Sequence, residues 1–210
     1  MELLNRGNSI SFQTDAVDFP ISSICIGLNW GAILKKRMLF GLFPIWENVD
    51  LDLSALIFNK EGQLIELIYP HQIVSNDSLI THSGDDPKGD RSLFDDHNDN
   101  EWINIKIDKL SLDVVQIFFV ISHNTPPVLD FGKIPYTKIR LYSGSPNKID
   151  HLFAVFSLHA LSEFDGKNNL VAGKLIRDGE TKWRFVGIGE AVNASKISEM
   201  VNIIEARFIR

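Results

Sequence analysis

The chain has 210 residues, 44% of them hydrophobic, and a formal net charge of −6 from 27 acidic and 21 basic side chains. It lacks the basic balance that phosphate neutralisation requires, so nucleic-acid binding is not expected as its main function. No apolar run approaches the roughly 20 residues that span a bilayer. A single cysteine, Cys25, excludes an intramolecular disulfide. With an N-terminus that turns polar early, these features predict a cytoplasmic protein with one domain over residues 1–210.

Alternation of apolar and polar residues predicts strands along most of the chain. The expected strands, in chain order, cover residues 9–12, 23–28, 51–58, 63–69, 102–107, 114–122, 137–141, 152–156, 172–176 and 182–186. Gly62 and the Asp178-Gly179 pair lie where hairpin turns are expected. Many short strands separated by turn residues are typical of an all-β fold, here an antiparallel β-sandwich.

The C-terminal segment alone has a helical period. Its apolar residues recur at i, i+3, i+4, i+7 and i+11, namely Ile197, Met200, Val201, Ile204 and Phe208. Asn193 and Ser195 are the candidate N-caps. We expect this C-terminal α-helix to pack on the sandwich, and the alternative is a helix that binds a partner.

A basic and aromatic insertion is expected over residues 31–48. Lys35-Lys36-Arg37 precedes the apolar run from Met38 to Trp46. Through residues 35–46 it would contact an anionic membrane surface or a protein partner. The alternatives are a loop folded over the core and a self-association contact.

An acidic loop is expected over residues 84–101. It holds seven acidic side chains against Lys88 and Arg91, a local net charge of −5. Crowded carboxylates repel one another, and Ca²⁺ relieves the repulsion because it takes six to eight oxygen ligands in irregular geometry. Mg²⁺ suits such a loop less well, and Zn²⁺ lacks the thiol and imidazole ligands that it favours. The alternative is a solvated loop that binds no ion.

A second acidic pair strengthens the calcium interpretation. Asp50 and Asp52 stand at i and i+2 at the start of an expected strand, so both carboxylates point to one face. Leu51 and Leu53 then point to the other face. A strand that begins with two carboxylates on one face favours a cation at that end.

Several motifs together resemble the TerD family of tellurium-resistance and stress-response proteins. The segment Asp50-Leu51-Asp52-Leu53-Ser54-Ala55 is similar to the family's Asp-Leu-Asp-Ala-Ser-Ala, and His82-Ser83-Gly84-Asp85-Asp86 is similar to its His-Thr-Gly-Asp-Asn. Further matches, in the expected order, lie at residues 4–12, 26–30, 99–101, 131–134, 140 and 182–189.

The resemblance implies a β-sandwich that binds one or two Ca²⁺ ions. The leading ligands that it implies are Asp50, Asp52, Asp85, Asp86, Asp99, Asn100 and Glu101. Residues 91–94 lengthen the acidic loop, so its middle residues, Asp90, Asp95 and Asp96, rank second. We expect a non-catalytic binding or scaffold module of a bacterial stress-response complex with an unidentified protein partner. A metal-assisted hydrolase that uses the acidic cluster is the alternative.

Overall fold

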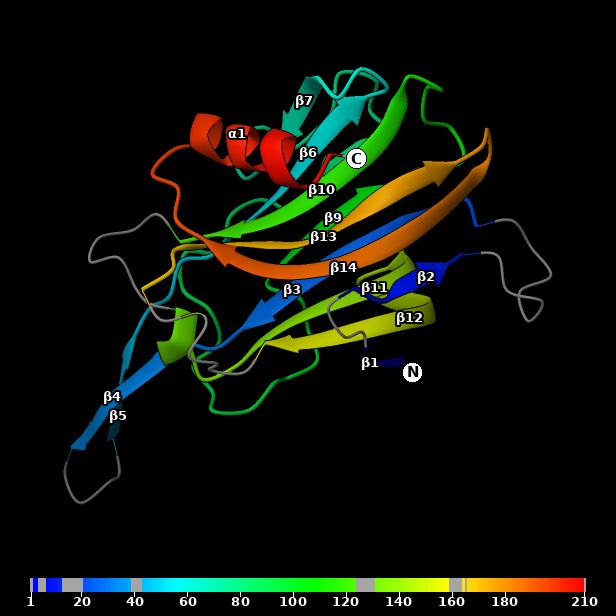
Figure 1. The fold of residues 1–210 in the computed structure, drawn as a ribbon. Helices are drawn as coiled ribbons and strands as arrows, with labels where there is room; N and C mark the ends of the chain where they lie inside the picture. Colours follow the sequence, from blue (N-terminus) through cyan, green and yellow to red (C-terminus); the bar gives the residue numbers. More distant parts are fainter. Residues whose placement is uncertain are drawn as a thin grey trace.

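The structure is a computed structural model that describes residues 2–3, 7–12, 21–38, 43–123, 131–158, 164 and 166–209. Two six-stranded sheets face each other, and one helix covers the outer face of the second sheet (Figure 1). The first sheet contains, in spatial order, β1 (Glu2–Leu3), β12 (Lys148–Leu158), β11 (Thr137–Ser145), β3 (Ile24–Trp30), β9 (Glu101–Ile105) and β8 (Ile80–His82). The second contains β2 (Ser9–Ser11), β14 (Lys182–Val192), β13 (Asn169–Asp178), β10 (Val114–Ser122), β6 (Asp52–Asn59) and β7 (Leu64–Ile68).

Strand pairing is antiparallel between the named strands except between β1 and β12, which run parallel. A short 3₁₀ helix, η1 (Phe131–Lys133), precedes β11. The predicted all-β sandwich with a C-terminal helix is confirmed. Every expected strand is present, although several extend beyond their predicted ends, since sheet hydrogen bonding continues past the alternating residues.

The main core lies between the two sheets. Leu51 and Leu53 are fully buried in it, as the alternation along this strand predicts. A smaller core lies on the other side of the second sheet, where Phe58 and Phe118 contact each other edge to face. The central strands β6 and β10 are therefore buried on both faces.

The helix α1 (Ile197–Arg207) forms the cover of this smaller core, with Met200 and Ile204 fully buried. The prediction that it packs on its own sandwich is confirmed. The predicted N-caps are wrong, because Lys196 occupies the N-cap position without a side-chain cap. The Ser195 hydroxyl instead donates to the Glu199 carboxylate at 2.9 Å. The described part of the chain contains no helix long and apolar enough to cross a membrane.

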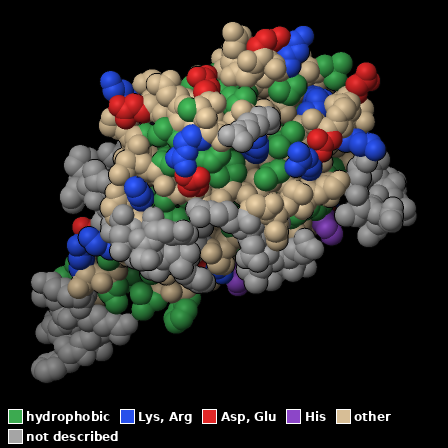
Figure 2. Space-filling view, viewed as in Figure 1, with side chains coloured by type: hydrophobic (Ala, Val, Ile, Leu, Met, Phe, Trp, Pro, Cys, Tyr) green, Lys and Arg blue, Asp and Glu red, His purple; other side chains and the backbone are tan. Residues whose placement is uncertain are grey.

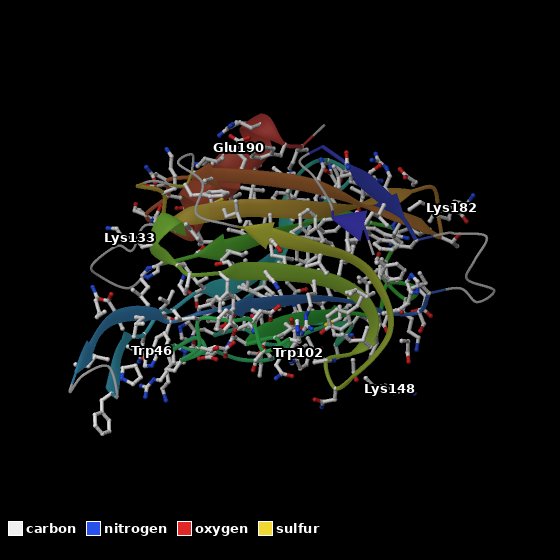
Figure 3. All side chains as sticks on the ribbon, turned by 90° about the horizontal axis from the view of Figure 1, so that it is seen from below. Trp46, Trp102, Lys133, Lys148, Lys182 and Glu190 are labelled. Atoms are coloured by element: carbon white, nitrogen blue, oxygen red, sulfur yellow. The ribbon has the colours of Figure 1, made fainter. Side chains whose placement is uncertain are left out.

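Within residues 31–48, the strands β4 (Ile33–Met38) and β5 (Phe43–Glu47) pair as a hairpin that projects from the body (Figure 1). A loop folded over the core was the wrong alternative for its described residues, because Phe43 is 59% exposed. Hydrophobic side chains gather where the hairpin leaves the body (Figure 2). Figure 3 shows Trp46 on the hairpin at one end of the molecule and Lys182 at the other.

Candidate metal centre

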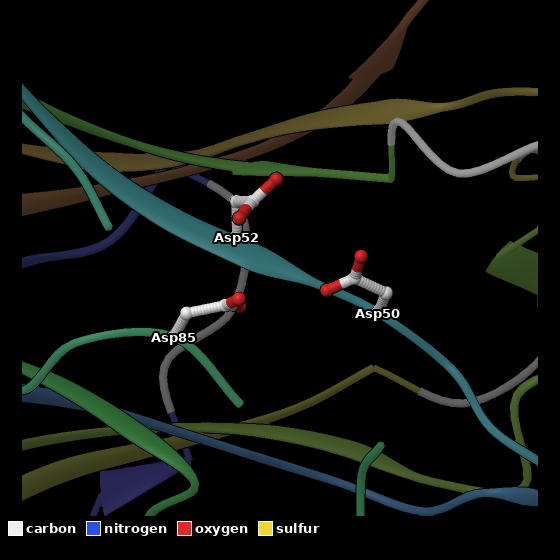
Figure 4. A group of neighbouring side chains, drawn as sticks. All are labelled: Asp50, Asp52 and Asp85. Carbon is white, nitrogen blue, oxygen red and sulfur yellow. The ribbon is translucent and has the colours of Figure 1, made fainter. Parts of the chain in front are cut away.

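Three aspartates meet at the end of the second sheet where β6 begins. One carboxylate oxygen each from Asp50, Asp52 and Asp85 lies within 4.8 Å of the other two (Figure 4). Asp50 and Asp52 share a face because Leu51, between them, points into the core. Asp85 comes from the segment that follows β8, so the group joins both sheets.

His82 fixes the position of the segment that carries Asp85. Its ring is buried, its Nδ1 accepts a hydrogen bond from the Gly84 N–H at 2.9 Å, and its Nε2 therefore carries the proton. Nε2 donates to the Leu53 carbonyl at 2.9 Å. Gly84 adopts a φ of +97°, a conformation that L-residues with side chains rarely adopt. Together these residues tie the Asp85 segment to strand β6.

Glu101 forms a second connection between the same segments. The side chain is fully buried, its Oε2 accepts from the Leu53 N–H at 2.8 Å, and its Oε1 accepts from the Asp86 N–H at 3.1 Å. Burial raises the pKa of this carboxyl. The Glu101 carboxylate thus links the backbone of Leu53 to that of Asp86.

Asp86, Asp90 and Asn100 form a separate group on the outer side of β3. The Asn100 amide donates to both carboxylates at 3.0 Å, while its Oδ1 accepts from the Trp30 N–H at 2.8 Å. Asp90 also accepts from the Tyr136 hydroxyl at 2.8 Å and from the Asn29 amide at 3.0 Å. The orientation of Asn100 is therefore set by hydrogen bonds, and its amide NH₂ faces the carboxylates.

The remaining predicted acidic ligands pair with donors from the first sheet. Asp99 accepts from Arg140 Nε at 2.8 Å and from the Tyr142 hydroxyl at 2.7 Å. Asp95 forms an ion pair with Lys138 of β11, and Asp96 accepts from the Asn29 amide of β3 at 3.3 Å. The acidic loop is thus held against β3 and β11 by cations and amides that these strands supply.

A shared cation would reduce the electrostatic repulsion among the Asp50, Asp52 and Asp85 carboxylates. The pKa of Asp85 is raised, first by burial and then by the nearby Asp50 carboxylate. Oxygens that share one Ca²⁺ at about 2.4 Å can lie up to about 4.8 Å apart, which is the limit within which these three lie. Among the described residues, no other group of three or more acidic, histidine or cysteine side chains meets within this distance. The residues therefore fit a hard divalent cation.

The sequence was compared with models of known protein families. The model described as "TerD domain" matches residues 2–203. The chain belongs to the TerD domain family. Tellurium resistance protein TerZ of Serratia marcescens is 25% identical over 206 residues, which cover 98% of this chain and 97% of TerZ. Stress response protein SCP2 of Bacillus subtilis (strain 168) is 24% identical over 192 residues, which cover 87% and 89% of the two chains.

Two crystal structures share the fold of this TerD domain. One is a homologue of telluride resistance protein (TerD), SCO6318 from Streptomyces coelicolor A3(2), with a TM-score of 0.64 and 13% identity. The superposition covers 86% of this chain and 98% of the SCO6318 chain. The other, a protein of unknown function called SAV2460, has the same TM-score and 14% identity, and covers 86% and 95%.

Several residues of the TerD domain's acidic region were missed from the sequence. Asn29, Tyr136 and Tyr142 are far from the acidic loop along the chain, and no local pattern links them to it. Ser54 is different, because it follows Asp50 and Asp52 at the same period of two. That alternation was a usable signal for the face that carries the aspartates.

Proposed function

We propose that this TerD domain is a non-catalytic Ca²⁺-binding module of a bacterial tellurium-resistance or stress-response system, acting in the cytoplasm. The observation that carries the proposal is the meeting of Asp50, Asp52 and Asp85 within 4.8 Å. Three carboxylates on two segments provide oxygen ligands in an irregular arrangement, which suits Ca²⁺ better than the strict octahedron of Mg²⁺. The ion would hold the Asp85 segment against β6. The names of TerZ and SCP2 support the assignment to a resistance or stress response.

A second Ca²⁺ would bind at Asp86 and Asp90. Asn29 lies beside Asp90 and is only 1% exposed, and its Oδ1 has no hydrogen-bond partner among the described residues. An unpaired buried oxygen costs free energy of about 1 to 3 kcal/mol unless a cation or water contacts it. With Asp86 and Asp90 it would supply three oxygen ligands for this ion.

Calcium titration by isothermal calorimetry tests the three-aspartate site. We expect Asp52→Asn to weaken Ca²⁺ binding by at least tenfold, because it removes one charged ligand, a loss of about 1.4 kcal/mol or more. Asp113→Asn is the matched control, since it removes the same charge just before β10, whose other end, Ser122, pairs with Asp52. Equal affinities for the two variants, or no calcium heat from the unaltered protein, would overturn the proposal. Turnover of a hydrolase substrate panel that Asp52→Asn abolishes would contradict a non-catalytic role.

The projecting hairpin is the proposed contact for a protein partner. Phe43 and Ile45 are 59% and 37% exposed on β5, and Lys35 lies on the neighbouring strand. We expect Phe43→Ser with Ile45→Ser to abolish capture of the partner from lysate without changing calcium affinity. Co-sedimentation of the unaltered protein with anionic vesicles, lost in the same variant, would instead assign the hairpin to a membrane surface.

A further inference from the structure

A groove of about 490 Å³ lies on the outer face of the first sheet, near the end of β9. We call it the β9 groove. Four segments line it: β8, β9 with the turn that follows it, residues 22–23 just before β3, and residues 144–146 at the end of β11. Strands β11, β3, β9 and β8 are consecutive neighbours in this sheet, so segments distant in sequence form one groove.

The alternation of side chains along β9 determines which of them face the groove. Ile103 and Ile105 are fully buried in the main core, so Trp102 (Figure 3) and Asn104 point to the outer face. Thr81 of β8 is paired with Asn104 and also lines the groove. This part of the groove therefore combines an indole ring with an amide and a hydroxyl group.

The indole of Trp102 gives the groove an apolar surface within a polar lining. The residue is only partly buried. Apart from Trp102, Gly144 and Pro146, every residue that lines the groove has a polar or charged side chain. The electron-rich face of an indole attracts weakly positive C–H groups, such as those of a sugar ring. A ligand with several hydroxyl groups and one apolar face therefore fits this lining better than a largely apolar ligand.

Two lysines determine the charge of the β9 groove. Lys106 and Lys109 are exposed in the turn after β9, where the Lys109 N–H donates to the Lys106 carbonyl at 3.1 Å. Within the described part of the chain, neither ammonium group forms an ion pair. The lining contains one acidic residue, Asp108. The groove is therefore locally positive on a chain of net charge −6, which favours an anionic ligand.

A phosphate group matches this pair of lysines better than a carboxylate does. A phosphate monoester carries a charge of about −1.5 to −2 at pH 7 and three acceptor oxygens, so it can contact both ammonium groups at once. Lysine binds phosphate as a compact positive charge with three N–H donors. The side chains of Ser22, Ser23 and Ser145 add hydroxyl groups to the lining, which can bond to further ligand oxygens.

We propose that the β9 groove binds a small sugar phosphate. The sugar ring lies on Trp102, its hydroxyl groups exchange hydrogen bonds with Asn104 and Thr81, and the phosphate contacts Lys106 and Lys109. None of the three aspartates of the proposed metal centre lines this groove. The inference is therefore independent of the proposed function.

Ligand-observed NMR titration of glucose 6-phosphate tests the inference, using the full chain. Glucose has the same ring without the charge, inorganic phosphate has the charge without the ring, and adenosine 5′-monophosphate adds an aromatic base. We expect glucose 6-phosphate to bind at least tenfold more tightly than glucose or inorganic phosphate. Its affinity should also fall as the salt concentration rises, because salt screens the lysine charges.

Substitutions separate the contribution of the ring from that of the charge. Trp102→Ala should weaken glucose 6-phosphate binding at least tenfold, whereas Trp102→Phe keeps an aromatic ring and should stay within threefold of the unaltered protein. Lys109→Met should weaken binding three- to tenfold. Lys182→Met is the matched control, because Lys182 lies on β14 of the second sheet, outside the groove, and it should leave the affinity unchanged.

The inference is overturned if glucose 6-phosphate does not bind, or if glucose or inorganic phosphate binds as tightly as it does. Tighter binding of adenosine 5′-monophosphate would assign the groove to an aromatic base and contradict the sugar ring. Equal weakening by Lys182→Met and Lys109→Met would contradict the role of the groove lysines. Should Trp102→Ala fail to fold, Trp102→Phe and Lys109→Met still test the two contacts.

Discussion

Glu101 links the two segments that carry the aspartates of the proposed metal site. It is fully buried and joins the backbones of Leu53 and Asp86, the residues that follow Asp52 and Asp85. The resemblance implies it as a metal ligand, which stays a prediction, and in the structure it accepts hydrogen bonds from two backbone N–H groups. Its role is to set the spacing between the two segments that carry the aspartates.

The variant Glu101→Gln should lower the free energy of unfolding by about 1 to 3 kcal/mol. A glutamine NH₂ group cannot accept a hydrogen bond, so it would face the Leu53 or the Asp86 N–H as a second donor. Urea denaturation measures the change, with Glu205→Gln on the exposed side of α1 as control. Equal stability of the two variants would show that Glu101 does not link these segments.

The pH dependence of stability can test whether the Cys25 thiol is buried and protonated in the folded protein. The thiol is fully buried and donates to the Tyr142 hydroxyl at 3.2 Å, and burial raises its pKa from 9.0 to about 12. Between these two pH values the unfolded chain has lost the thiol proton and the folded chain keeps it, so stability falls as pH rises.

The unfolding free energy of the unaltered protein should therefore fall relative to that of Cys25→Ala above pH 9. The expected loss is about 2 kcal/mol between pH 9 and pH 10.5, at about 1.4 kcal/mol per pH unit. Denaturant titrations of both proteins at the two pH values measure it. A constant difference between them would contradict a buried, protonated thiol.

Helix α1 is the element that covers the smaller core on the outer face of the second sheet. Lys174, on β13, secures its far end, since Nζ donates to the Phe208 carbonyl at 2.6 Å and to Gln116 Oε1 at 2.9 Å. The ammonium also lies 5.0 Å from the centre of the Phe118 ring. The helix is thus anchored at both ends, because Asn168 and Asn169 hold the segment before it.

Replacing Lys174 with Met should loosen the helix while the sandwich stays folded. The substitution keeps an apolar stem but leaves the Phe208 carbonyl and the Gln116 amide oxygen without their donor, which costs about 1 to 3 kcal/mol. Hydrogen exchange should show at least tenfold faster exchange in α1 than in the unaltered protein, with β10 unchanged. Equal exchange rates in α1 would contradict the anchoring role.

The chain has a net charge of −6, and the fold pairs some of its acidic side chains with basic ones and leaves others outside ion pairs. Asp95 and Asp99 are paired with Lys138 and Arg140 of β11, so part of the acidic loop is neutralised by the first sheet. The three aspartates at the start of β6 lie apart from these pairs. Asp50, Asp52 and Asp85 thus form a group of carboxylates separate from the ion pairs of the acidic loop.

The sequence predicted the sandwich because its strands alternate clearly, and it predicted the docked helix from a regular apolar stripe. The projecting hairpin was not predicted as strands, since its basic and aromatic residues do not alternate. The burial of both faces of β3 was not predicted either. It arises because the acidic loop covers the outer face of this strand. At Gly27 an added Cβ would overlap the Asp99 carboxylate. Such long-range contacts leave no local pattern.

The same limit applies to the site. Asp50 and Asp52 were predicted by period, and Asp85 was implied by resemblance together with four further leading ligands. The sequence could not separate Asp85 from those four, because their roles depend on which donors the fold brings to them. Arg140 and Tyr142 hold Asp99, whereas Asp85 faces two other carboxylates.

The proposed function depends on one Ca²⁺ ion that Asp50, Asp52 and Asp85 would share. Crystals grown in CaCl₂ and measured at a wavelength with anomalous calcium signal test it most directly. We expect an anomalous peak at about 2.4 Å from a carboxylate oxygen of each of the three aspartates. A fully loaded crystal with no peak between these side chains would contradict it.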